Sequence, residues 1–314
     1  MRKRSTVALL VGAVLAISVT AAGLVSLPGV GGAAGVPRTR PFYLSLGDSY
    51  SVGYQPGKGA TAGYTAYVAK QTKMRLENFG CGGATTTSIL SSTGCTTSGY
   101  GPGAAIDPVA YPATTQVAAA VAFIAANPGR VGLVTVSIGG NDVTRCASAP
   151  SPVACVVKAT STVAANVGAL VRRVKTALTA AGDSTAKIIG LTYPDVLLGL
   201  YVHPSVPPTK TAASLAGLSV TAFDTLINPT LMTAYTSVQG GAFVDVTSAP
   251  YQLATSGDAT PLTTTVRLRP YGVVPVAVWE ICKLTYYCSA GNIHANAQGY
   301  RFIGQLAVAE YTKL

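Results

Sequence analysis

The chain has 314 residues, of which 49% are hydrophobic and 11% are charged, and its formal net charge at pH 7 is +11. This length is enough for one large domain or two small ones, and the composition excludes a disordered, highly charged chain. The sequence contains 11 acidic residues and 2 histidines. So few ligands argue against a His-rich metal site or a calcium loop. We therefore expect no metal and no cofactor.

Residues 1–36 have the pattern of a secretory signal peptide rather than of a folded element. Basic residues at 2–4 precede an apolar stretch at 7–19, and small residues follow at 21–23 and 31–34. Cleavage at either small-residue cluster stays open. The alternative is an uncleaved anchor, but the apolar run is short for a membrane span of about 20 residues. We expect a secreted, extracellular protein with no membrane span after processing.

The elements that follow alternate along the chain. Short apolar runs, most of them ended by Gly or Pro, predict strands at 42–46, 76–79, 131–138, 187–191 and 242–246. The stretches predicted to be helical are 62–72, 114–126, 155–181, 215–235 and 297–311. This alternation indicates a three-layer α/β/α sandwich around a central parallel sheet of about five strands.

Two stretches rich in Gly, Pro, Ser and Thr, residues 91–113 and 200–212, indicate long surface loops. Neither has the character of a domain linker, because strands and helices resume after each. We predict a single domain over residues 37–314. His203, before a proline in the second loop, is expected to be a surface residue or part of a substrate entrance.

Six cysteines in an exported chain indicate disulfide bonds. Sequence alone leaves many pairings open, but closing a short loop costs the least entropy. Proximity therefore favours three local pairs: Cys81–Cys95, Cys146–Cys155 and Cys282–Cys288. No CxxC motif occurs, so neither a zinc ribbon nor thioredoxin chemistry is expected.

Residues suited to catalysis follow the predicted strands, where the active site of a parallel α/β sheet lies. Ser49 stands on a Gly-led turn after the first strand, a good position for an exposed nucleophile. The Gly-rich loop 80–85 follows the second strand and can present bare backbone N–H groups. Asn141 follows the third strand and can donate its amide to an oxyanion. His294 precedes the last helix and can act as a base.

Taken together, these residues resemble the SGNH, or GDSL, hydrolase superfamily. Its four blocks contribute Ser, Gly, Asn and His in that order, and the matching blocks here are Gly47-Asp48-Ser49-Tyr50, Gly83, Gly139-Gly140-Asn141-Asp142 and His294. The match extends over residues 43–312. The exported chain with three expected disulfides resembles the secreted actinobacterial esterases and lipases of this superfamily. The resemblance implies the flavodoxin-like fold of the SGNH hydrolases.

The resemblance also implies a role for each matching residue. Ser49 would be the nucleophile, and His294 would be the general base and then the acid for the leaving alcohol. The oxyanion hole would consist of the N–H groups of Ser49 and Gly83 and the side chain of Asn141. Gly83 is chosen over its neighbouring glycines because it precedes Ala-Thr, as in the family pattern.

One position departs from that pattern. Most relatives have Asp three residues before the His, where this chain has Gly291. We therefore predict a Ser49–His294 dyad in which the carbonyl of Gly291 accepts from Nδ1–H of His294. The pKa of His294 is then expected near its ordinary value of about 6.5. The alternative is that the fold brings a distant acid to His294: Asp245, Asp258 or Glu280.

Within this resemblance, we expect each disulfide to brace a loop of the site; the alternative is that the disulfides only stabilise an exported domain in general. One cysteine of each pair lies close in sequence to a site residue: Cys81 to Gly83, Cys146 to Asn141 and Cys288 to His294.

The expected activity is hydrolysis of carboxylic esters, with lipid or short-to-medium acyl chains. Apolar residues predicted near the site suggest an apolar pocket wall: Leu197, Leu198, Leu200 and Tyr201. The alternatives are a carbohydrate O-acetyl esterase and a non-catalytic envelope- or polymer-binding protein on the same fold. Transfer of the acyl group to an acceptor other than water also stays open.

The net positive charge favours anionic partners such as lipid headgroups or cell-envelope polymers. The basic residues beyond the N-terminal segment are scattered, which argues against nucleic-acid binding. We expect a monomer.

Overall fold

The computed structural model describes residues 40–60, 62–95, 105–202, 210–247 and 260–314. The expected signal peptide, His203 and Asp258 lie outside the described residues. Residues 40–314 make one compact unit.

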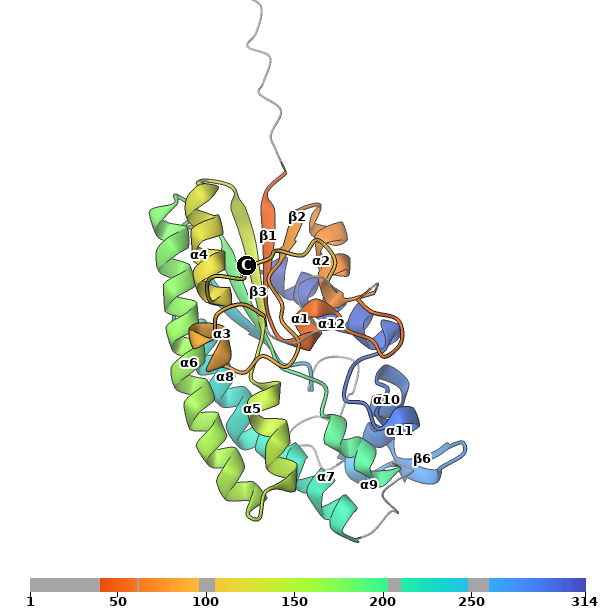
Figure 1. The fold of residues 1–314 in the computed structure, drawn as a ribbon. Coiled ribbons are helices and arrows are strands. Elements are labelled where there is room, and N and C mark those ends of the chain that lie inside the picture. The colour runs from red at the N-terminus through yellow and green to blue at the C-terminus, as the bar shows by residue number, and fades with distance from the viewer. Residues whose placement is uncertain (1–39, 61, 96–104, 203–209, 248–259) are drawn as a thin grey trace, which may run out of the picture. The chain divides into compact units, whose positions relative to one another are not determined.

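Five parallel strands form the central sheet, in the order β2-β1-β3-β4-β5 (Figure 1). They are β1 (Phe42–Gly47), β2 (Arg75–Asn78), β3 (Val131–Ser137), β4 (Lys187–Leu191) and β5 (Gly241–Val244). Every residue of β1 is buried, and β3 is buried at all but one position, as expected for strands covered on both faces. The predicted parallel α/β sheet is confirmed.

Helices cover both faces of this sheet. On one face lie α2 (Tyr64–Thr72) and α12 (Ala297–Tyr311), and on the other lie α4 (Gln116–Ala126), α6 (Pro152–Ala180) and α8 (Asn228–Thr236). Helix α10 (Val276–Leu284) packs beside α12 and η3 (Val196–Tyr201). Successive strand residues point to opposite faces. Tyr43 and Leu133 accordingly pack in the core with α2 and α12, whereas Leu44 and Val134 pack with α4 and α6.

Helix α6 is the one helix, within the described part of the chain, that is long and apolar enough to cross a membrane by length and composition. Its buried residues recur at helical spacing, and six of them belong to the core under the sheet: Val163, Val167, Leu170, Val171, Val174 and Leu178. These contacts are those of a core helix.

The remaining helices lie around the carboxyl ends of the strands and in the C-terminal third of the chain. They are α1 (Ser49–Val52), α3 (Ser88–Ser91), α5 (Gly140–Thr144), η2 (Arg145–Ser148), η3 (Val196–Tyr201), α7 (Lys210–Ala222), the π-helical η4 (Phe223–Ile227), α9 (Thr260–Thr263) and α11 (Tyr287–Ala290). An antiparallel hairpin joins β6 (Thr265–Leu268) to β7 (Gly272–Pro275).

The strand order puts β1 between β2 and β3, so the connections from β1 and β3 lead to opposite sides of the sheet. In open α/β sheets, such a reversal opens a crevice at the carboxyl ends of the two strands. The segments that follow β1 and β3 carry Ser49 and Asn141, which therefore meet at this crevice.

A substitution at Gly190 tests how tightly β4 packs on α8 at Tyr235. A Cβ at Gly190 would overlap the ring of Tyr235, which is fully buried. We expect Gly190→Ala to lower the free energy of unfolding by about 1–3 kcal/mol through overpacking. At Gly217, inside α7, an added Cβ would meet no neighbouring atom. Gly217→Ala should therefore raise the free energy of unfolding by roughly 0.5–1 kcal/mol, because alanine favours a helix more than glycine does. Urea denaturation of both variants measures the difference, and equal effects would contradict this packing.

Candidate active site

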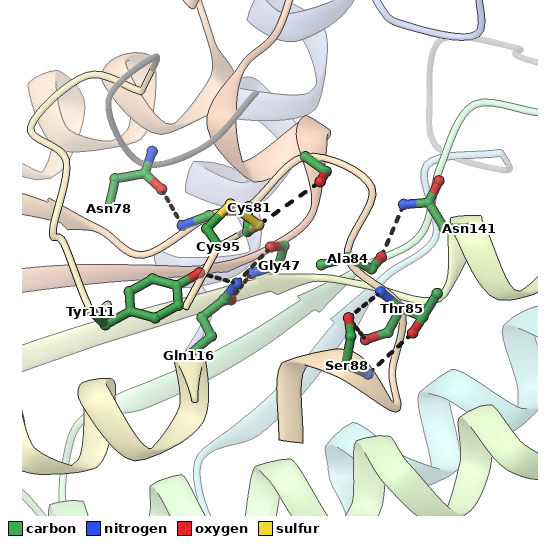
Figure 2. The surroundings of a disulfide bond; sticks show 12 residues. Gly47, Asn78, Cys81, Ala84, Thr85, Ser88, Cys95, Tyr111, Gln116 and Asn141 are labelled. Carbon is green, nitrogen blue, oxygen red and sulfur yellow. Dashed lines mark hydrogen bonds between the residues drawn. A yellow bond between two sulfur atoms is a disulfide. The ribbon is translucent and has the colours of Figure 1, made fainter. Parts of the chain in front are cut away.

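A sharp turn after β1 positions Ser49. Gly47 has φ +136°, and its peptide is held from both sides by one side chain: its N–H donates to Oε1 of Gln116 (2.6 Å) and its carbonyl accepts from Nε2 (3.0 Å) (Figure 2). Asp48 then caps α1, since its Oδ1 accepts from the N–H of Tyr50 (2.9 Å). Ser49 is the first residue of α1 and is 6% exposed. The Gly-led turn thus directs the serine into the crevice.

Ser49 and His294 are in hydrogen-bond contact although 245 positions separate them in sequence. The distance from Ser49 Oγ to His294 Nε2 is 2.8 Å. On the other side of the ring, His294 Nδ1 lies 2.7 Å from Oδ1 of Asn292. An amide oxygen can only accept, so Nδ1 carries the proton and Nε2 is left to accept the hydroxyl proton of Ser49. This is the tautomer that a general base needs.

The role predicted for the Gly291 carbonyl falls to Asn292 instead. Gly291 ends α11 in a left-handed conformation (φ +63°), and its N–H bonds to Tyr287. Oδ1 of Asn292 also accepts from the backbone N–H of His294 (3.1 Å), which makes an Asx turn. This turn brings the side chain, rather than the preceding carbonyl, to Nδ1. An Asn two residues before a candidate base is a signal that could have been found in the sequence.

The distant acids considered for His294 do not take this role. Asp245 accepts from the N–H and the hydroxyl of Thr247 (2.8 and 2.6 Å), and Glu280 lies on α10 near Lys283. Asp258 lies outside the described residues. Within the described ranges, no carboxylate hydrogen-bonds His294.

Two tyrosines enclose the imidazole. The rings of Tyr50 and Tyr54 lie 5.9 and 4.7 Å from that of His294, centroid to centroid. The hydroxyl of Tyr50 donates to the carbonyl of Ile293 (2.6 Å), which fixes the loop just before the histidine. Burial lowers the pKa of His294 to about 4. The expected value of about 6.5 is therefore too high, because no carboxylate offsets the loss of solvent around the imidazolium.

Asn141 lies beside the Gly-rich loop, as Figure 2 shows. Its Nδ2 donates to the carbonyl of Ala84 (2.9 Å) and makes a longer contact with Oδ2 of Asp48 (3.4 Å). The carboxylate of Asp142 ties the two loops together, since it accepts from both the N–H and the hydroxyl of Thr86 (2.9 and 2.8 Å). Gly83, next to Ala84 in the chain, has a left-handed backbone (φ +75°) and is exposed.

Tyr193, which follows β4, joins the site through Asp48. Its hydroxyl donates to Oδ2 of Asp48 at 2.6 Å. Burial raises the pKa of Asp48 to about 7, although the bonds from Tyr193 and the N–H of Tyr50 favour the carboxylate. Asp48 thus links the nucleophile turn, Asn141 and the end of β4. Neither Tyr193 nor Gln116 was identified from sequence, because each acts through a partner distant in the chain.

A largely apolar cavity opens beside Ser49. Its walls come from α5, α6, η3, η4 and α8, and the residues on them include Asn141, Val143, Val163, Tyr193, Leu197, Phe223, Ile227, Leu231 and Ile293. Of the leucines expected to form an apolar wall, Leu197 lines this cavity and Leu198 is buried in the core. Gly83 lines a different hollow, together with Tyr111 and Gln116.

The structure holds three disulfides, each between cysteines close in sequence: Cys81–Cys95, Cys146–Cys155 and Cys282–Cys288. The first lies directly against the turn after β1, because the N–H of Cys81 donates to the carbonyl of Gly47 (3.0 Å) (Figure 2). The third lies in the segment that leads to Asn292 and His294.

Residues 45–302 match the GDSL-like Lipase/Acylhydrolase family. The chain belongs to this family and is a carboxylic ester hydrolase. No curated protein sequence matches it significantly.

Three solved structures that are similar to the chain have low sequence identity to it. A lipolytic protein of the G-D-S-L family from Desulfitobacterium hafniense DCB-2 is 12% identical, with a TM-score of 0.38 over 86% of this chain and 99% of that one. The lipase Lip_vut3 from goat rumen metagenome is 12% identical, with a TM-score of 0.43 over 86% and 96%. A carbohydrate esterase is 11% identical, with a TM-score of 0.38 over 89% and 70%.

The ionisation of His294 can be followed by NMR of the imidazole, with His203→Asn used to assign the two histidines. We expect His294 to stay neutral down to about pH 4. Asn292→Asp places a carboxylate beside Nδ1 and should raise the pKa by at least about one pH unit. Gln71→Glu, an exposed and remote position on α2, adds the same charge and should leave the pKa unchanged. A wild-type pKa near 6.5 would contradict the described burial.

Proposed function

We propose that this protein is a secreted hydrolase of lipid or short-to-medium acyl esters that works through an acyl-enzyme on Ser49. The observation that carries the proposal is the 2.8 Å contact between Ser49 Oγ and His294 Nε2 beside an apolar cavity. Family membership supports the ester-hydrolase chemistry.

The proposed reaction has two halves. As Ser49 Oγ attacks the ester carbonyl carbon, His294 Nε2 takes the hydroxyl proton and then delivers it to the leaving alcohol. Water attacks the acyl-enzyme in the second half, again with His294 as base, and the acid is released as Ser49 regains its proton. Asn292 stabilises the transient imidazolium with a neutral amide oxygen, which is weaker support than a carboxylate would be.

The negative charge on the tetrahedral oxygen requires donors. The proposed donors are the N–H groups of Ser49 and Gly83 and Nδ2 of Asn141. One hydrogen of Nδ2 is committed to Ala84, while the other makes only the 3.4 Å contact with Asp48. A contact of that length is weak, so this hydrogen is the one available to the oxyanion.

The walls of the cavity favour an acyl chain over a sugar. The residues that line it include three valines, two leucines, two isoleucines and one phenylalanine. An apolar acyl group gains free energy by removing this surface from water, whereas sugar hydroxyls would lose hydrogen bonds there. Three disulfides support the export of the chain to an oxidising compartment.

Replacing the nucleophile tests the mechanism. Ser49→Ala removes the attacking oxygen and should lower kcat/KM for p-nitrophenyl butyrate by at least about 10³-fold. Ser184→Ala, at an exposed serine before β4, should retain wild-type activity. Circular dichroism should show both variants folded. A folded Ser49→Ala variant with near-wild-type activity would overturn the proposal.

Replacing Asn141 separates a role in the transition state from a role in binding. Asn141→Ala should lower kcat by about 10²–10³-fold with little change in KM, because the oxyanion forms only in the transition state. Steady-state kinetics on the same ester measure both constants. An increase confined to KM would assign Asn141 to substrate binding instead.

A further inference from the structure

A second apolar cavity adjoins the one beside Ser49. It has a volume of about 340 Å³, within the range of roughly 300–1,000 Å³ that is usual for ligand pockets. It lies among α5, η2, the N-terminal part of α6, α7 and η4. The two cavities share lining residues: Val143, Leu197, Phe223 and Ile227. The two cavities are therefore adjacent, and the apolar region that they make together, from Ser49 to the second cavity, is called the passage below.

Helix α6 forms one wall along the whole passage. The residues that line it lie on one face of the helix, at spacings of three and four: Val153, Val156, Val157, Thr160 and Val163. From Pro152 to Val163 the helix rises about 16 Å, at about 1.5 Å per residue. With carbon–carbon bonds of about 1.5 Å, that length matches an extended chain of roughly a dozen carbons.

The far end of the passage presents uncovered apolar side chains. Val153 and Val157 on α6 are 58% and 52% exposed, and Leu218 on the facing helix α7 is 47% exposed. Exposed apolar residues that gather around a groove mark a binding surface more often than isolated ones do. The passage is thus apolar along its length and open to solvent at the end away from Ser49.

Two links hold the walls of the passage. The Cys146–Cys155 disulfide joins η2 to the first turns of α6, and Cys146 itself lines the second cavity. The hydroxyl of Ser219 on α7 donates to Oδ2 of Asp195 (2.7 Å), and these two residues line the second and the first cavity respectively. These links hold η2 against α6, and α7 against the start of η3.

We propose that this passage binds a long linear acyl chain of roughly a dozen carbons or more, with the ester carbonyl at Ser49. The proposal rests on the proposed function, because it orients the acyl group by the nucleophile. The occupant is an acyl chain because the passage continues the cavity of the nucleophile and its walls are nearly all apolar. The exposed rim lets the end of a longer chain remain in contact with apolar side chains.

The experiment compares p-nitrophenyl butyrate with p-nitrophenyl palmitate. Val156 is half-buried and lines the second cavity, so Val156→Trp should obstruct the passage. We expect kcat/KM for the palmitate to fall at least tenfold and that for the butyrate to stay within twofold. Ala154→Trp, an exposed position on the same helix outside the lining, should leave both values within twofold. Equal losses on both esters, or no loss on the palmitate, would overturn the proposal.

Binding without turnover separates this inference from the proposed function. Ser49→Ala should bind the long fluorescent fatty acid cis-parinaric acid, and Ser49→Ala/Val156→Trp should bind it at least tenfold more weakly. Leu215→Trp, on the opposite wall, repeats the test if Val156→Trp fails to fold. Absence of ester turnover with fatty-acid binding intact would reject the proposed function and leave the passage as a binding site. Absence of fatty-acid binding would reject the passage.

Discussion

The peptide around Gly47 is the constraint on which the site depends. Its two hydrogen bonds to Gln116, together with the bond from Cys81 to its carbonyl, hold the end of β1 from two other segments. The N–H of Asp48 also donates to the carbonyl of Ser137 in β3 (3.0 Å). A Cβ at Gly47 would overlap that carbonyl. Only glycine lets β1 end this close to β3, and this closeness brings Ser49 near the residues that follow β3.

The loop before His294 places a neutral amide beside Nδ1, where most relatives have the carboxylate of an aspartate. A carboxylate beside Nδ1 would stabilise the imidazolium and raise the pKa of His294. Asn292 fixes the same tautomer and ring orientation without adding charge. With burial, this keeps the base neutral over a wider range of acidic pH. The loop therefore stabilises the imidazolium less than a carboxylate would. In return, His294 stays neutral, and able to accept a proton, at lower pH.

The sequence predicted the five strands and the serine, asparagine and histidine because each signal is local. Short β-branched runs ended by glycine predict buried strands, and the site residues stand directly after them. The β6–β7 hairpin escaped prediction because each strand has only four residues, which is too few for an alternating pattern to stand out in the sequence. Helix α10 escaped for a related reason: its β-branched and aromatic residues do not favour a helix on their own.

Contacts between distant segments could not be predicted in the same way. Gln116 on Gly47, Tyr193 on Asp48 and Thr86 on Asp142 depend on how the loops meet above the sheet. Asn292 is the exception, since an Asx turn is encoded within three residues. The error over Gly291 came from placing the acceptor by analogy with relatives rather than by the turn chemistry of this loop.

The disulfides couple the geometry of the site to the redox state of the compartment. Cys81 and Cys288 lie in the loops that lead to Gly83 and His294, and Cys146 follows the helix that begins beside Asn141. Such bonds persist under oxidising conditions and are rare where thiols are kept reduced. A newly made chain in a reducing cytosol lacks all three restraints at once. The order of these segments therefore depends on an environment that keeps the three disulfides oxidised.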